Sequence, residues 1–146
     1  MPDWMQRITL VLNMHGMHWT GYIFNTYADM LAILQWVDRR IRGERVLVYL
    51  PAWDGRYYWN YPEYRPDERM GGVQGLKRLI DGAHAMGYKI MPMFGATAIN
   101  RRHPEYSRLS RSIFRLPEGQ IVSAHLADWD ADRDYSESWV PLNLGH

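Results

Sequence analysis

Short apolar runs alternate along the chain with longer stretches in which apolar residues recur at helical spacing. The runs cover residues 8–14 (ITLVLNM), 46–50 (VLVYL) and 88–94 (YKIMPMF). Continuous apolar runs of this length are typical of strands that are buried on both faces of a parallel sheet. We therefore predict three buried strands, each followed by a polar, aromatic or glycine-containing loop.

Two amphipathic helices are predicted between these strands. In the first, Thr26 and Asp29 resemble a capping box, and Gly43 stands where a C-terminal cap belongs. Its apolar stripe comprises Ile23, Tyr27, Met30, Leu34, Val37 and Ile41. The second helix follows Gly71 and Gly72 and ends at Gly87. Its predicted inner face comprises Val73, Leu76, Ile80 and Ala83.

The order strand, helix, strand, helix, strand predicts an α/β fold with a parallel sheet in a single domain over residues 1–146. After Gly95 we expect only a short helix within 100–116 and a strand over 120–124. Three parallel strands leave sheet edges exposed, and exposed edges favour pairing with another chain. We expect the chain to form the opening part of a longer barrel or a half that forms a homo-oligomer.

Composition narrows the classes of partner and chemistry. The formal net charge is +1, which gives no support for a nucleic-acid partner. No apolar run approaches the roughly 18 residues that a membrane span needs, so no membrane partner is expected. The chain has no cysteine, which excludes disulfides, thiolate metal sites and a thiol nucleophile. Nothing resembles a glycine-rich phosphate loop, and we predict no cofactor.

The loop after the second strand is the most informative segment. Its sequence over 51–67, PAWDGRYYWNYPEYRPD, interleaves aromatic rings with charged and amide side chains. Ligand sites in α/β folds lie at the carboxyl ends of strands. Aromatic rings stack on the apolar faces of sugars, and polar groups bind their hydroxyls. The alternative is that these rings pack onto the loop's own scaffold.

Several side chains are candidate sugar ligands at this edge of the sheet. Asp54 is either a hydroxyl acceptor or simply part of an Asp-Gly turn. His15, His18 and Trp19 follow the first strand, and Asn100 follows the third. In the aromatic loop the candidates are Trp53, Arg56, Tyr57 and Trp59.

A metal site is not predicted. His15 and His18 lack a convincing third ligand. The acidic segment around 128–134 has the spacing of a calcium loop, but Arg133 replaces the required glycine and Trp139 the required glutamate. A calcium site of another kind is the alternative, and a solvated loop with Arg133 as its internal counter-charge is the better interpretation.

Three segments together resemble the N-terminal part of the catalytic (β/α)8 barrel of glycoside hydrolases, of the α-amylase-like and related groups. They are VLVYLPAWDGRYYWNYPEY, RMGGVQGLKRLIDGAHAMGYKIMPMFGATAIN and ADWDADR. The resemblance implies the first three strands of a TIM barrel and an oligosaccharide or polysaccharide substrate. It also implies catalytic carboxylates at the fourth and later strands, beyond residue 146. Such a pair stands roughly 5 to 9 Å apart.

Two other functions compete with this hypothesis. One is a non-catalytic sugar-binding module that is completed by self-association through its sheet edges. The other is a metal-dependent hydrolase that uses His15, His18 and the acidic segment, and the ligand spacing makes it the weakest of the three.

Overall fold

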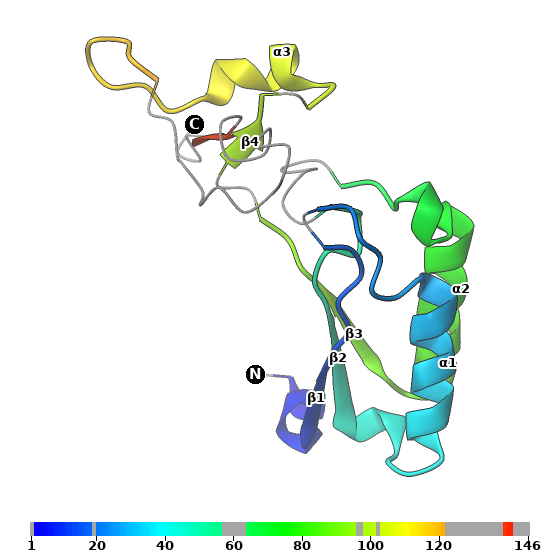
Figure 1. Ribbon diagram of the computed structural model, residues 1–146. Coiled ribbons are helices and arrows are strands. Elements are labelled where there is room, and N and C mark those ends of the chain that lie inside the picture. Colours follow the sequence, from blue (N-terminus) through cyan, green and yellow to red (C-terminus); the bar gives the residue numbers. More distant parts are fainter. Residues whose placement is uncertain are drawn as a thin grey trace.

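The computed structural model describes residues 2–18, 20–56, 64–95, 98–101, 103–121 and 139–141. Its main part is a parallel sheet of three strands in the order β1-β2-β3 (Figure 1). The strands are β1 (Leu10–Asn13), β2 (Val46–Leu50) and β3 (Lys89–Pro92). The predicted parallel strands are therefore confirmed, although β1 and β3 are shorter than their apolar runs.

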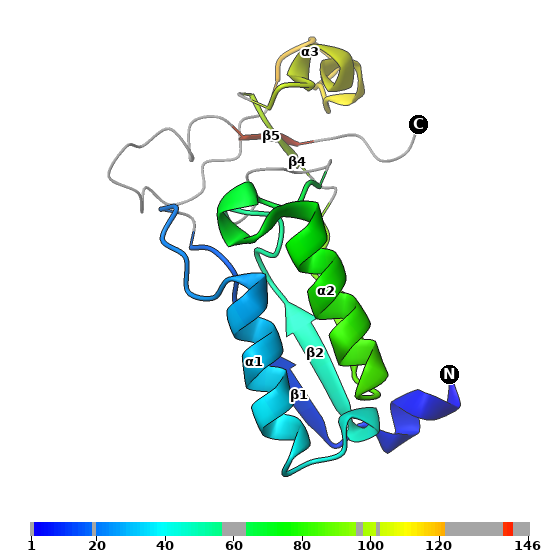
Figure 2. The same ribbon diagram turned by 90° about the vertical axis from the view of Figure 1, so that its right-hand side faces the viewer.

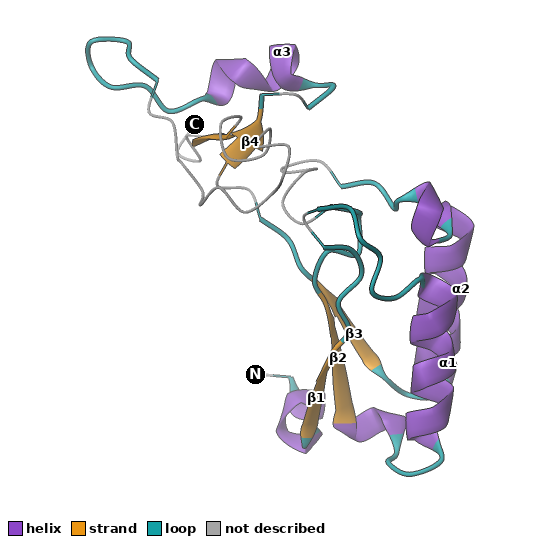
Figure 3. Ribbon diagram, in the orientation of Figure 1, coloured by secondary structure: helices purple, strands orange, loops and turns teal. Residues whose placement is uncertain are grey.

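Helices α1 (Tyr27–Asp38) and α2 (Gly72–Ala85) lie side by side on one face of this sheet (Figure 2). Three short 3-10 helices belong to the same part of the chain: Asp3–Arg7, Gly43–Arg45 and Glu68–Met70. The opposite face of the sheet carries no α-helix within the described part of the chain (Figure 3).

The start of α1 is set by local hydrogen bonds. The Thr26 side chain accepts a hydrogen bond from the Asp29 backbone N–H, and the Asp29 carboxylate accepts one from the Thr26 N–H at 2.9 Å. The predicted capping box is therefore confirmed. Tyr27, Met30, Leu34 and Val37 of the predicted stripe are buried.

The predicted C-terminal end of that helix was wrong, and two residues of the predicted stripe lie outside the helix. Ile23 precedes the cap, Ile41 lies beyond Asp38, and Gly43 belongs to the following 3-10 helix rather than to a helix cap. A Cβ at Gly43 would lie 2.1 Å from the carbonyl oxygen of Met86. Gly43 is thus needed for a close backbone approach to the end of α2.

The inner face of α2 also differs from the prediction. Its buried residues are Gly72, Gly75, Leu79 and Ala83, whereas Val73 is 60% exposed. The ring of Tyr27 packs against Gly75, where a Cβ would lie 3.0 Å from Tyr27 Cδ2. This close contact between α1 and α2 turns a glycine, and not Val73, toward the interior.

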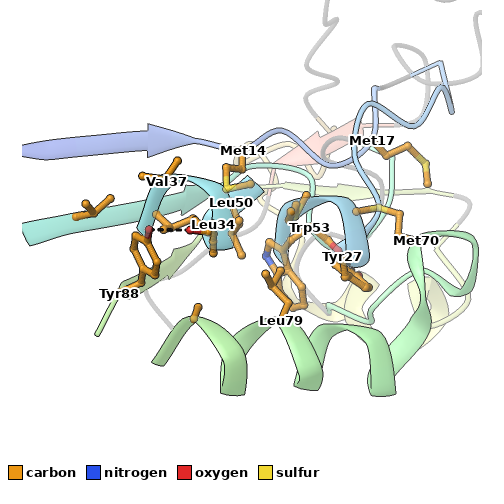
Figure 4. Close-up of a cluster of buried hydrophobic side chains, with 14 residues drawn as sticks. Met14, Met17, Tyr27, Leu34, Val37, Leu50, Trp53, Met70, Leu79 and Tyr88 are labelled. Carbon is orange, nitrogen blue, oxygen red and sulfur yellow. Dashed lines mark hydrogen bonds between the residues drawn. The ribbon is translucent and has the colours of Figure 1, made fainter. Parts of the chain in front are cut away.

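The main core fills the space between the sheet and the helices (Figure 4). Val46, Val48 and Leu50 are fully buried there. Alternate residues of a strand point to the opposite face, and on that face Val11 is 56% and Met91 43% exposed. The prediction that the strands are buried on both faces was therefore wrong, because the helices of the described residues cover only one face.

A second, smaller region follows Gly95. Strand β4 (Ala98–Asn100) pairs antiparallel with β5 (Trp139–Pro141), and helix α3 (Tyr106–Leu109) continues into the 3-10 helix Ser110–Ser112. Ile99 and Ile113 form its core. The predicted short helix is confirmed. Of the strand expected over 120–124, Ile121 forms an isolated bridge with Arg115, and 122–124 lie outside the described residues.

Candidate functional site

The loops at the carboxyl ends of β1, β2 and β3 are joined by backbone hydrogen bonds (Figure 1). Gly16 N–H donates to the Pro51 carbonyl at 3.0 Å, and Met17 N–H donates to the Ala52 carbonyl at 3.2 Å. Met93 N–H donates to the Leu50 carbonyl at 3.0 Å. The parallel pairing therefore continues past the strand ends, and it holds the three loops at one edge of the sheet.

The turn after β2 is compact and strained. Residues 51–55 are all buried, and Ala52 adopts a φ of 51°, a left-handed conformation that is rare for a residue other than glycine. A Cβ at Gly16 would lie 2.3 Å from the Ala52 carbonyl oxygen, so only glycine allows this approach. Backbone strain of this kind is concentrated at ligand-binding and catalytic sites.

Trp53 lies in this turn and is only 8% exposed. Its side chain points from the turn into the core, toward the layer of helices (Figure 4). The indole Nε1–H donates to the Met93 carbonyl at 3.0 Å, and the ring stacks on Tyr64 with centroids 5.9 Å apart. Trp53 therefore joins the β2 and β3 loops. Most of its surface is used for packing, and a sugar-stacking role stays a prediction.

Phe94 is the exposed ring beside Trp53. It is 63% exposed and makes edge contacts with Trp53 at 5.7 Å and Tyr64 at 4.9 Å. The Tyr64 hydroxyl donates to the Gly95 carbonyl and accepts from the Gly95 N–H. Sequence reasoning did not single out Phe94, because its apolar run suggested a buried strand that continued to residue 94.

Tyr27 positions the same turn from the first residue of α1. Its hydroxyl donates to the Trp53 carbonyl at 2.5 Å, and the residue is 1% exposed. Burial raises the pKa of this phenol, and the negative charge of Asp54 adds to the shift. Tyr27 therefore stays protonated and remains a donor at neutral pH. The sequence showed it only as a member of the apolar stripe.

Asp54 and Arg56 complete the described part of the β2 loop. Asp54 is 4% exposed, so its carboxylate is enclosed within the buried turn. Arg56 is half-buried and forms a parallel bridge with Met17 of the β1 loop. The structure thus brings Asp54 and Arg56 next to the segment that holds His15 and His18.

His15 and His18 are half-buried, and both of their rings contact Phe24. Their rings are perpendicular to Phe24, at centroid distances of 5.2 Å and 5.7 Å. His15 Nε2–H donates to the Met17 carbonyl at 3.2 Å, and His18 Nδ1 lies 2.8 Å from the Thr20 hydroxyl. Burial lowers the pKa of His15, so this imidazole is neutral at pH 7.

Asn100 lies in β4 of the second region, where its side chain is fully buried. The backbone carbonyl of Asn100 accepts a hydrogen bond from the backbone N–H of His103 at 2.9 Å. His103 is itself buried, and its Nδ1 accepts from the Glu105 N–H at 3.1 Å. Asn100 is thus part of a turn that closes β4, and its predicted role in sugar binding stays a prediction.

Three candidate ligands, Trp19, Tyr57 and Trp59, lie outside the described residues, as does the acidic segment 128–134. Within the described residues, no group of three or more His, Asp or Glu side chains is arranged to hold a metal ion. No described helix is long and apolar enough to cross a membrane.

Comparison with known proteins adds the fold relationship. No protein-family model matches the sequence, and a search of curated protein sequences found no match. Solved structures do match. The α-N-acetylgalactosaminidase of Bifidobacterium bifidum in its GalNAc complex has a TM-score of 0.68 at 16% identity, covering 93% of this chain and 22% of that one.

Two further glycosidases give similar values. The α-galactosidase of Thermus thermophilus in complex with stachyose has a TM-score of 0.62 at 14% identity, over 93% of this chain and 26% of that one. The α-amylase of Geobacillus thermoleovorans complexed with acarbose has a TM-score of 0.62 at 17% identity, and the match covers 97% of this chain and 34% of that one. The chain therefore spans between 22% and 34% of the length of these three structures.

These matches confirm the predicted fold class. The chain, with its open sheet of three parallel strands and its helices, matches the N-terminal part of TIM-barrel glycosidases in fold. The chain thus has the fold of the first part of a (β/α)8 barrel.

Proposed function

We propose that the complete protein hydrolyses glycosidic bonds and that this chain supplies part of its sugar-binding surface. The supporting observation is the position of the polar and aromatic residues. His15, His18, Asp54, Arg56 and Phe94 all follow the carboxyl ends of parallel strands, which is the edge at which (β/α)8 barrels bind their substrates.

Each of these groups has a chemical role toward a sugar. Arg56 and the two histidines supply hydrogen bonds to hydroxyl groups, and the Asp54 carboxylate accepts hydrogen bonds at the floor of the site. Phe94 offers an exposed ring to the apolar face of a pyranose. Tyr57 and Trp59, which follow Arg56 in the sequence, are proposed as further stacking rings.

Hydrolysis of a glycosidic bond needs a pair of catalytic carboxyl groups. We propose that the catalytic pair is carried by later strands of the barrel. On this basis the 146-residue chain binds oligosaccharides without turning them over.

The test is an NMR titration of the isotope-labelled chain with stachyose, maltoheptaose or N-acetylgalactosamine. We expect amide shifts at residues 15–18, 53–56 and 94–95. Asp54→Asn should weaken binding about tenfold or more, since hydrogen bonds to charged groups contribute roughly 1.5 to 3 kcal/mol.

Asp81→Asn is the matched control. It makes the same change on an exposed carboxylate of α2, whose partner is Lys77 at 2.5 Å. Equal saccharide affinities for the two folded variants would remove Asp54 from the site. No saccharide-dependent shift in the wild-type chain would contradict the proposed function itself.

A second candidate function is favoured by one observation, the exposed face of the sheet. Val11 and Met91 are 56% and 43% exposed on the face away from the helices, and β1 and β3 each pair with β2 alone among the described strands. This arrangement suits a sugar-binding module that is completed by a second copy of the chain.

A further inference from the structure

We infer that Tyr22 and Phe24, in the loop between β1 and α1, form an additional stacking subsite for a pyranose ring of a neutral oligosaccharide. We call this pair the Tyr22–Phe24 ledge. The inference rests on the proposed function, because it assigns a further contact to the same substrate. It concerns residues that the sequence analysis did not select.

The ledge presents two adjacent aromatic rings to solvent. Tyr22 is 66% exposed and Phe24 is 50% exposed. Their ring centroids lie 5.3 Å apart with the planes at 77°. A single exposed ring needs no explanation. Two rings in contact, in a loop that follows the carboxyl end of a parallel strand, form a surface where a ligand can be placed.

The backbone under the ledge is held in place. His18 N–H donates to the Tyr22 carbonyl at 2.7 Å, and Phe24 N–H donates to the Gly16 carbonyl at 2.9 Å. Met17 and Ile23 form an antiparallel bridge between the two sides of the loop. Because these contacts hold residues 16–18 and 22–24 in place, little conformational entropy is lost when a sugar stacks on the two rings.

The ledge is also tied to the strand-end site. Gly16, which accepts the hydrogen bond from Phe24, donates its own N–H to the Pro51 carbonyl at the start of the buried turn. Asn25 Nδ2 donates to the His15 carbonyl at 2.8 Å. The rings of His15 and Phe24 have centroids 5.2 Å apart. A ligand that reaches His15 with one sugar can therefore extend along the same loop and place another sugar on the ledge.

The chemistry of the loop favours a neutral ligand. Residues 14–26 contain no Asp, Glu, Lys or Arg. The polar groups around the rings are the imidazoles of His15 and His18, the Thr20 hydroxyl and the Asn25 amide. Burial lowers the pKa of His15, which keeps that imidazole uncharged at neutral pH. Two cations border the loop: Arg56 forms a bridge with Met17, and Arg69 donates to Met17 Sδ at 3.2 Å and is paired with the Asp67 carboxylate at 2.9 Å. Because the loop itself carries no charged side chain, stacking and hydrogen bonds rather than ion pairs would hold a ligand on the two rings.

The test compares Phe24→Ala with Phe114→Ala, a control at a ring that is 42% exposed in the second region. Binding of maltoheptaose and stachyose to the chain is measured by calorimetry, and binding of N-acetylgalactosamine by NMR. We expect Phe24→Ala to weaken binding of the preferred oligosaccharide about tenfold, the effect of losing a half-exposed ring as contact area. Phe24→Ala should keep the wild-type affinity for N-acetylgalactosamine. Phe114→Ala should keep the wild-type affinity for the oligosaccharide.

Phe24→Leu guards against a folding defect, because leucine keeps apolar bulk beside His15 but has no flat face. Phe24→Leu should weaken oligosaccharide binding as Phe24→Ala does. Phe24→Tyr keeps a flat ring and should bind the oligosaccharide like the wild type. Wild-type oligosaccharide affinity in folded Phe24→Ala or Phe24→Leu overturns the inference. If Asp54→Asn still weakens binding in that case, the proposed function stands without the ledge. An absence of saccharide binding in the wild-type chain overturns both.

A loss of self-association in Phe24→Ala, with saccharide affinity unchanged, also overturns the inference. In that case the ledge is a contact between copies of the chain. Sedimentation velocity of the same samples gives this readout.

Discussion

Tyr27→Phe is the sharpest test of how the turn at 51–55 is held. The substitution removes one oxygen atom and leaves the ring that packs against Gly75 in α2. The lost hydrogen bond joins the Tyr27 hydroxyl to the Trp53 carbonyl at 2.5 Å, in a position that is 1% exposed. Because water has little access there, the Trp53 carbonyl loses its donor without a replacement.

The size of the effect follows from that burial. A typical hydrogen bond contributes roughly 0.5 to 1.5 kcal/mol net, and a buried polar group left without a partner costs roughly 1 to 3 kcal/mol. We expect Tyr27→Phe to lower the free energy of unfolding by about 2 kcal/mol. The strained turn should also relax, which moves the amide signals of Ala52, Trp53 and Asp54 and weakens saccharide binding.

Tyr88→Phe is the matched control. The Tyr88 hydroxyl donates to the Leu34 carbonyl at 2.9 Å and is also buried. The Leu34 carbonyl lies inside α1, where the helical ladder supplies another donor. The decrease in the free energy of unfolding caused by Tyr88→Phe should therefore be smaller, about 1 kcal/mol. The amide signals of Ala52, Trp53 and Asp54 should not move.

Urea unfolding followed by tryptophan fluorescence measures both variants, and amide spectra report on the turn. A destabilisation by Tyr27→Phe below about 0.5 kcal/mol, with unchanged signals at 52–54, would refute the assignment of this hydrogen bond as the support of the turn.

Two further predictions concern pH and association. The imidazole of His15 should titrate in NMR below its ordinary pKa of 6.5. As the pH falls, His15 is therefore protonated at a higher pH in the unfolded chain than in the folded chain. The free energy of unfolding should consequently fall as the pH drops from about 6.5 toward the lowered pKa. The same dependence of the unfolding free energy on pH in His15→Gln would contradict this origin. If the second candidate function holds, sedimentation should show a dimer whose dissociation constant rises about tenfold or more in Val11→Lys, since a charge replaces an apolar contact. Val73→Lys, at a position 60% exposed on α2, should leave the dimer unchanged, and a wild-type chain that stays monomeric at every concentration would exclude this function.

The order of strands and helices could be predicted from the sequence because it depends on local patterns. The apolar run at 46–50 became β2 without a change of bounds. Thr26 and Asp29 formed the predicted capping box because both partners lie within one helical turn. The resemblance to the opening of a glycosidase barrel was confirmed in fold, because two of its three segments contain whole strand or helix units.

The site depended on contacts between residues far apart in the chain. Whether Trp53 is exposed is decided by Met93 and Tyr64, which lie beside it only after the sheet has formed. Phe94 is a second example. It lies at the end of an apolar run that predicted a buried strand, but its side chain is exposed.

By itself the sequence determined that the chain makes parallel strand-helix units with aromatic and polar loops after the strands. Local hydrogen bonding and apolar spacing carry that information. Only the tertiary structure decided that one face of the sheet is covered, that Gly16 meets Ala52, and that Tyr27 holds the turn beside Asp54. The physical reason is that burial and hydrogen-bond partners across 26 to 40 residues are set by packing, which no local pattern specifies.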